Sequence, residues 1–215
     1  MPTLDLSQPL RAGDLSYPGD PPVRLSPHAT HDADGYRVTH LSMGSHAGTH
    51  VDAPAHLLPD GMTLPDYDVE TFSFDAVRVR LTDHGPRSPI TRDDLVPVEE
   101  DADAVVLWTG WDRYWNEPAY FDHPHLTPDA ASFLAAADLH VCVDAPNVDP
   151  TPTTNADPDE SDGFPAHEAL FDADRLIVEN LTNLGRPPRR FTLDAYPLPL
   201  EDADGAPVRA VARWE

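Results

Sequence analysis

Apolar and polar residues alternate most regularly over Phe74–Leu81, which predicts a strand with one buried face. Two continuous apolar runs, Ala104–Trp108 and Leu139–Val143, have strand length and predict strands that are buried on both faces. Weaker strand patterns occur in four more segments: Thr3–Ser7, Asp174–Leu181, Phe191–Leu200 and Val208–Trp214. The chain is therefore expected to be built around a sheet.

Helical signals are fewer. Thr127 followed by Pro128 is a typical helix start, and the alanine-rich run after them predicts a helix that continues to Ala137. Shorter helices are expected after a Thr91 cap and over Ala166–Phe171. Strands that alternate with a few helices indicate an α/β fold with mixed strand pairing.

Two further strands, Val23–Thr30 and Tyr36–Met43, flank the polar turn His31–Gly35 and predict a hairpin. The second strand leads directly into residues 45–56. Loops that follow strands are places where a scaffold presents reactive groups.

Residues 45–56 carry the densest chemistry in the chain, with four metal-ligand types close together: His46, His50, Asp52 and His56. Gly48 and Pro54 oppose a helix, so an extended or looped backbone is expected. In an extended chain these even offsets place the four side chains on one face, and a loop could also gather them around one point. The spacing favours a metal or catalytic site over solvated histidines.

The net charge of the chain limits the classes of partner that it can bind. It has 215 residues, 40% of them hydrophobic, with 38 acidic and 14 basic residues and a formal net charge of -24. All the basic residues are arginine. This acidity excludes nucleic acid and anionic membranes as partners and, with no lysine present, suggests adaptation to high salt in a halophilic source. The length fits one domain over residues 1–215.

Cys142 is the single cysteine, so no intrachain disulfide can form, and its apolar surroundings favour a small core residue. No basic-then-apolar segment opens the chain and no apolar run reaches about 18 residues. We therefore expect a cytoplasmic protein.

Several residues outside the dense stretch allow two interpretations each. Glu179 lies in an apolar run and is either outward-facing or buried with a partner or metal. Tyr17, before a Pro-Gly-Asp turn, is either a packing residue or a pocket wall, and Trp111 and Trp115 pose the same choice. Residues 151–163 are polar and rich in turn formers, and could form a mobile excursion or lid.

The run from His46 to His56 resembles the signature His-x-Gly-Thr-His-x-Asp-x-Pro-x-His at all seven fixed positions. That signature is typical of the cyclase family of metal-dependent hydrolases, which includes bacterial kynurenine formamidase and isatin hydrolase. Three other segments are similar to family segments: Tyr17–Asp20, Thr109–Trp111 and Asp144–Pro150. His167, followed twelve residues later by Glu179, looks like the family's distal ligand pair.

The resemblance implies a swivelling β/β/α fold, a homodimer or homotetramer, and one or two zinc or manganese ions per subunit. It implies these metal ligands: His46, His50, Asp52, His167 and Glu179. Asp52 and Glu179 would bridge if two metals bind. His56 would exchange protons and Tyr17 would line the substrate pocket.

The implied reaction is hydrolysis of an amide, formamide or lactam C–N bond in a small molecule, as in an arylformamidase. Tyr17 stands where kynurenine formamidases of the family typically carry tryptophan, so hydrolysis of isatin or a cyclic imide is an alternative. A metal-stabilised binding protein without turnover is another. His56 favours an enzyme, because a purely structural site needs no free base.

Overall fold

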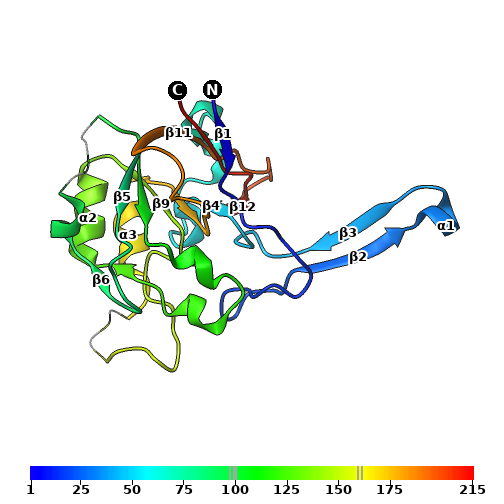
Figure 1. Cartoon of the computed structure of the whole chain (residues 1–215), viewed down its shortest axis with the longest axis horizontal. Helices are drawn as coiled ribbons and strands as arrows, with labels where there is room; N and C mark the ends of the chain where they lie inside the picture. Colours follow the sequence, from blue (N-terminus) through cyan, green and yellow to red (C-terminus); the bar gives the residue numbers. More distant parts are fainter. Residues whose placement is uncertain (97, 99–100, 159, 161) are drawn as a thin grey trace.

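The centre of the computed structural model, which describes residues 1–96, 98, 101–158, 160 and 162–215, is a mixed sheet (Figure 1). Nine strands of the described residues form it, in the order β1-β13-β11-β5-β7-β9-β10-β4-β12. Its central strands are parallel: β5 (Ser73–Arg80), β7 (Ala104–Trp108), β9 (His140–Val143) and β10 (Ile177–Glu179). The flanking strands pair antiparallel: β1 (Thr3–Asp5), β13 (Val211–Arg213), β11 (Arg190–Asp194), β4 (His50–Asp52) and β12 (Gly205–Pro207).

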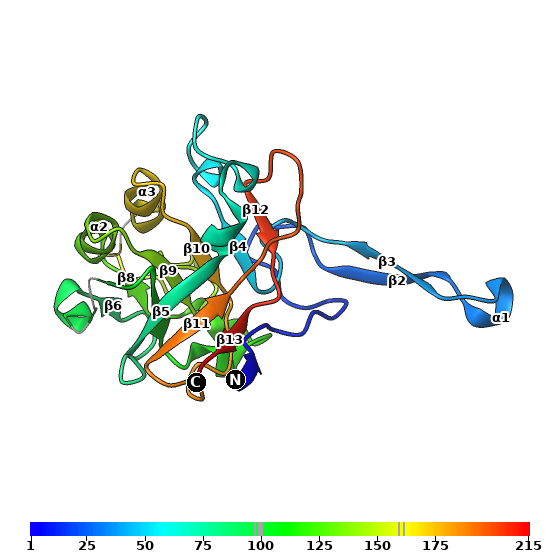
Figure 2. The same cartoon turned by 90° about the horizontal axis from the view of Figure 1, so that it is seen from above.

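Both faces of the central strands are buried, as the apolar runs predict. In β7, Ala104 and Val106 join one hydrophobic cluster, while Val105 and Leu107 join another on the opposite face. The second cluster lies under helices α2 (Pro128–Ala136) and α3 (Pro165–Phe171), which stand together beside the sheet in Figure 2. Cys142 is fully buried in the first cluster, and burial raises the pKa of its thiol.

The sheet curls, so that its two ends meet over the first cluster. Beyond β1, the Leu6 amide donates to the Ala210 carbonyl and the Leu6 carbonyl accepts from the Thr182 amide, both at 2.9 Å. Thr182 follows β10, which is separated from β1 by five strands in the sheet order. The mixed α/β fold expected from the sequence is confirmed.

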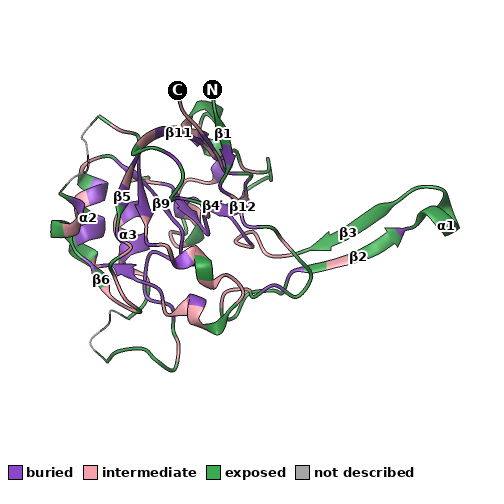
Figure 3. Cartoon of the chain, viewed as in Figure 1, coloured by how far each residue is buried: buried purple, intermediate pink, exposed green. Residues whose placement is uncertain are grey.

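A hairpin of β2 (Arg24–Ala29) and β3 (Val38–Ser42) projects far from the body as an arm (Figure 1). Nearly all of it is exposed (Figure 3). The predicted turn at its tip is a short helix, α1 (His31–Asp34), because the Thr30 hydroxyl accepts from the Ala33 amide. Gly35 ends that helix in the left-handed region, at φ 76°.

Two sequence predictions are corrected. The strand expected over Phe191–Leu200 ends at Asp194, because Pro197 and Pro199 cannot donate to a sheet ladder. The helix expected after Thr91 is a 3₁₀ turn, η4 (Arg92–Leu95), closed by hydrogen bonds between Thr91 and Asp94. Strand β12 was not predicted.

The smaller elements complete the chain. A two-stranded ladder joins β6 (Pro89–Ile90) and β8 (His125–Leu126). The other 3₁₀ turns are η1 (Pro54–His56), η2 (Leu64–Asp66), η3 (Val69–Phe72), η5 (Trp111–Tyr114) and η6 (Pro118–Phe121). Within the described ranges, no helix has the length and apolar character needed to cross a membrane.

The segment predicted as a lid, residues 151–163, includes residues 159 and 161, which lie outside the described residues. Of the rest, Thr151 is buried and Glu160 accepts a hydrogen bond from Arg87 Nε at 2.6 Å. The lid stays a prediction.

Candidate metal centre

The backbone conformation of residues 45–56 is set by a glycine with left-handed dihedral angles and by a short strand. Gly48 has φ +70°, and an added Cβ would lie 2.6 Å from Leu10 Cδ2, so the chain needs glycine for both conformation and space. The chain then enters β4, where His50 and Asp52 are buried and close together, with His50 Nε2 3.1 Å from Asp52 Oδ1. The η1 turn after β4 brings His56 back toward them. The backbone of residues 45–56 is therefore extended over β4 and looped or turned elsewhere, within the expected extended or looped backbone.

The five predicted ligands come together in two groups that share Asp52. In the first group, the Nδ1 atom of His46 lies 2.6 Å from Asp52 Oδ1. In the second, His167 Nε2 lies 3.9 Å from Asp52 Oδ2 and 3.6 Å from Glu179 Oε1. Antiparallel pairing of β10 with β4 places Glu179 opposite His50, and their side chains approach to 3.6 Å.

Outer hydrogen bonds orient two of the histidines. The Nδ1–H of His50 donates to the Gly48 carbonyl and that of His167 donates to Asp149, each at 2.8 Å, with both Nε2 atoms left facing the centre. Asp149 also accepts from the amides of Ala166 and His167, at the start of α3. Such partners fix the tautomer of a metal-binding histidine. The sequence analysis singles out Asp144–Pro150 but assigns no histidine-orienting role to Asp149.

The buried carboxylates of the centre favour positive charge beside them. Burial, reinforced by Asp52, raises the pKa of Glu179 to about 7. Burial opposes the charged form of His167, but hydrogen bonds to Asp149 and Asp52 raise its pKa to about 10. Two buried carboxylates beside three imidazoles form a donor set that suits a divalent metal such as zinc or manganese.

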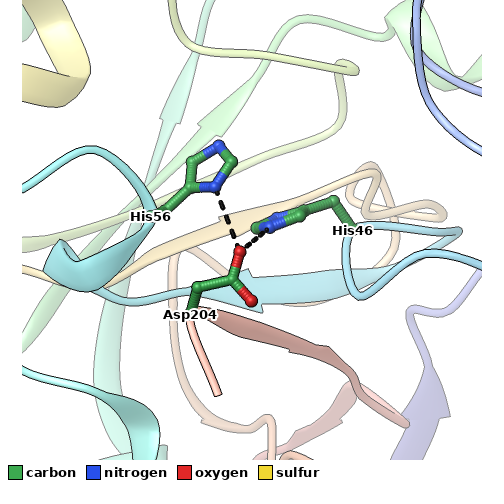
Figure 4. A group of neighbouring side chains, drawn as sticks. All are labelled: His46, His56 and Asp204. Atoms are coloured by element: carbon green, nitrogen blue, oxygen red, sulfur yellow. Dashed lines mark hydrogen bonds and ion pairs between the residues drawn. The ribbon is translucent and has the colours of Figure 1, made fainter. Parts of the chain in front are cut away.

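His56 and Asp204 lie beside His46, one of the five predicted ligands (Figure 4). The rings of His56 and His46 lie with their centroids 4.0 Å apart and their planes tilted by 41°. Asp204 Oδ2 is 2.9 Å from His46 Nε2 and 3.4 Å from His56 Nδ1. Sequence reasoning missed Asp204, because it ends an acidic turn, Glu201–Asp204, that looks like any solvated surface.

A cavity of about 230 Å³ opens onto this centre. Its lining includes Tyr17, Trp115, Phe121 and Phe164. Burial raises the pKa of Tyr17 to about 12, so its hydroxyl stays protonated, and its ring meets Phe121 edge-on at 6.3 Å. Trp111, by contrast, is a core residue with 2% exposure. Aromatic walls beside a metal centre form a pocket for a flat molecule.

The family of the chain follows from comparison with known proteins. The family model described as "Putative cyclase" matches residues 4–150. Kynurenine formamidase from Bacillus cereus (strain ATCC 14579) is 34% identical over 214 residues, with 98% of this chain and 96% of the relative covered. Kynurenine formamidase from Salinibacter ruber is 32% identical over 222 residues, covering 99% and 98%. The chain therefore belongs to the cyclase family.

Solved structures share the fold. An isatin hydrolase bound to the product analogue thioisatinate has a TM-score of 0.84 at 24% identity, covering 98% of this chain and 91% of that one. A protein from Bacillus stearothermophilus described as a "predicted metal-dependent hydrolase" has a TM-score of 0.78 at 24% identity, covering 98% of this chain and 97% of that one. The family resemblance carried by His46–His56 is confirmed by the family model and by the kynurenine formamidase relatives.

Proposed function

We propose that this protein is a metal-dependent hydrolase that cleaves an amide, formamide or lactam C–N bond, with arylformamidase-like activity. The observation that carries the proposal is the buried cluster around Asp52, open to an aromatic cavity. The kynurenine formamidases among its relatives support the same class of reaction.

Five residues would hold the metal: His46, His50, Asp52, His167 and Glu179. Because Asp52 belongs to two ligand groups, these residues would hold one or two zinc or manganese ions per subunit. When bound, such a metal polarises a carbonyl oxygen and lowers the pKa of water toward neutrality.

His56 would move the protons. It lies at the cavity, with about a third of its side chain exposed, and its ring centroid is 4.0 Å from that of His46. It belongs to neither ligand group around Asp52, although His46, His56 and Asp204 form a third group close enough to hold an ion. It would take a proton from the attacking water and return it to the leaving nitrogen. Tyr17 and Trp115 would hold the flat part of the substrate, and Phe164 would close the cavity wall.

An isatin or cyclic-imide hydrolase is the second candidate. It is favoured by the fold shared with an isatin hydrolase and by Tyr17 in place of the tryptophan expected for kynurenine formamidase. An intact lactam fused to an aromatic ring and a formanilide both place the scissile carbonyl one nitrogen away from the ring, so the same walls can serve both.

We propose that the arm contacts a second copy of the chain in a homodimer or homotetramer. Tyr36, Val38 and Leu41 on it are 57%, 40% and 47% exposed, and a lone two-stranded hairpin is marginally stable in water. The arm over residues 24–42 has two arginines and two aspartates, whereas the whole chain has a net charge of -24. This neutral arm can approach another acidic body without repulsion.

The assay offers N-formylkynurenine, isatin and simple cyclic imides to the protein loaded with zinc, manganese or cobalt. Turnover of the formamide before the others supports the leading proposal, and isatin turnover supports the second. A protein that binds metal and turns over none of them would be a binding protein. Metal counting by mass spectrometry distinguishes one ion from two. Light scattering of the wild type and of Val38→Ser/Leu41→Ser tests whether the arm joins subunits.

A further inference from the structure

We infer that Asp204 is a positioning residue that orients both the proton-transfer histidine, His56, and the metal-ligand histidine, His46. The inference rests on the proposed function for its effect on rate. Its structural basis is one carboxylate oxygen, Asp204 Oδ2, that contacts a ring nitrogen of each of two neighbouring imidazoles (Figure 4).

The first consequence concerns His46. Its Nε2–H donates to Asp204 at 2.9 Å, and its Nδ1 lies 2.6 Å from Asp52 Oδ1, so Nδ1 is the nitrogen that would lose its proton to bind a metal beside Asp52. The other two histidine ligands do the opposite, because His50 and His167 use Nδ1 for their outer hydrogen bonds and present Nε2. Asp204 therefore selects the nitrogen with which His46 would bind metal.

The second consequence concerns His56. When the Nδ1–H of His56 donates to Asp204, Nε2 becomes the nitrogen with a free lone pair. The contact is long, at 3.4 Å, so it guides the ring rather than locking it. A base oriented by a carboxylate in this way exchanges protons from a defined atom.

Backbone pairing fixes the place of Asp204. Its carbonyl accepts from the Ala53 amide at 2.8 Å, and the next residue, Gly205, pairs with Asp52 across the β12–β4 ladder. A Cβ on Gly205 would lie 2.5 Å from His46 Cε1. Asp204 thus supplies a hydrogen-bond acceptor for the His46 ring, and Gly205, which has no side chain, leaves room for that ring.

The test compares Asp204→Ala and the isosteric Asp204→Asn with Asp202→Asn. Asp202→Asn is the control, because it removes one negative charge from the same turn. Asp202 is exposed, and asparagine tolerates its φ of 52°. Zinc affinity is measured by chelator competition, and the tautomers of His46 and His56 by ¹⁵N NMR of the zinc-loaded protein. Turnover gives kcat and KM separately.

For Asp204→Ala we expect zinc affinity and kcat to fall by about 10–100-fold each, with KM changed much less. His56 should lose its Nδ1–H tautomer, Asp204→Asn should give an intermediate loss, and Asp202→Asn should match the wild type. Wild-type tautomers and zinc affinity in Asp204→Ala would overturn the inference. So would an extra metal ion bound by Asp204 in the wild type. If the wild type turns over no substrate, the proposed function fails, but the tautomers and zinc affinity still test Asp204.

Discussion

Gly205→Ala is the smallest change that tests the geometry of the site. An alanine Cβ at this position would lie 2.5 Å from His46 Cε1, 3.0 Å from His46 Nδ1 and 3.1 Å from the Val51 carbonyl. Carbon atoms in contact prefer about 3.5–4.0 Å, so the ring must move by about 1 Å. The carbonyl belongs to the β4–β12 ladder and cannot yield easily.

The magnitude follows from that displacement. Overpacking of this kind costs roughly 1–3 kcal/mol of stability. A misplacement of about 1 Å near reacting groups costs roughly 100-fold in rate. We therefore expect kcat/KM to fall about 100-fold and zinc affinity to fall with it, while the fold survives.

Chelator competition, turnover and urea unfolding of the metal-free protein measure the three effects separately. Gly85→Ala is the matched control, because its Cβ would meet only Ser88 Oγ, at 3.7 Å. A Gly205→Ala protein with wild-type zinc affinity and rate would refute the assignment of His46 to the metal centre.

Three further predictions concern proton transfer, salt and acid. His56→Ala should keep its metal and lose about 10²–10⁴-fold in kcat, whereas metal loss measured by mass spectrometry would make His56 a ligand. With a net charge of -24, the protein should unfold at higher temperature as KCl is added, and a midpoint indifferent to salt would contradict salt adaptation. Burial lowers the pKa of His140 to about 4, below its unfolded value. The buried neutral imidazole therefore contributes fully to the free energy of unfolding above about pH 6.5, and this contribution is lost as the pH falls toward 4. His140→Gln, which can still accept from the Leu176 amide, should reduce that acid loss by about 3 kcal/mol in urea titrations, and an unchanged pH slope would count against this account.

Local patterns predicted the parts of the fold that depend on neighbouring residues. Strand β7 has the predicted bounds, and α2 begins at Pro128 after its Thr127 cap, because a buried apolar run and a helix cap are short-range signals. The motif from His46 to His56 was equally visible. Its Gly48 has the left-handed conformation that a loop around one point needs.

Features that depend on distant parts of the chain were missed. Asp204 has nothing around it in the sequence to mark it, because its partners His46 and His56 lie about 150 residues away. Strand β12 is three residues long and contains Pro207, so its pattern is too short to detect. Asp149 lies in a loop, and the amides that its carboxylate accepts from belong to the start of α3, which is distant in the sequence.

The pairing of β4 between β10 and β12 also sets the order in which the site can form. A chain made from its N-terminus exposes His46, His50 and Asp52 early, but their partner strands begin at Ile177 and Gly205. Such distant pairings lose the entropy of closing a long loop before their contacts can stabilise them, and so they form late. An ion captured by the growing chain meets a fraction of its ligands, and full affinity arrives only when the last strands have docked.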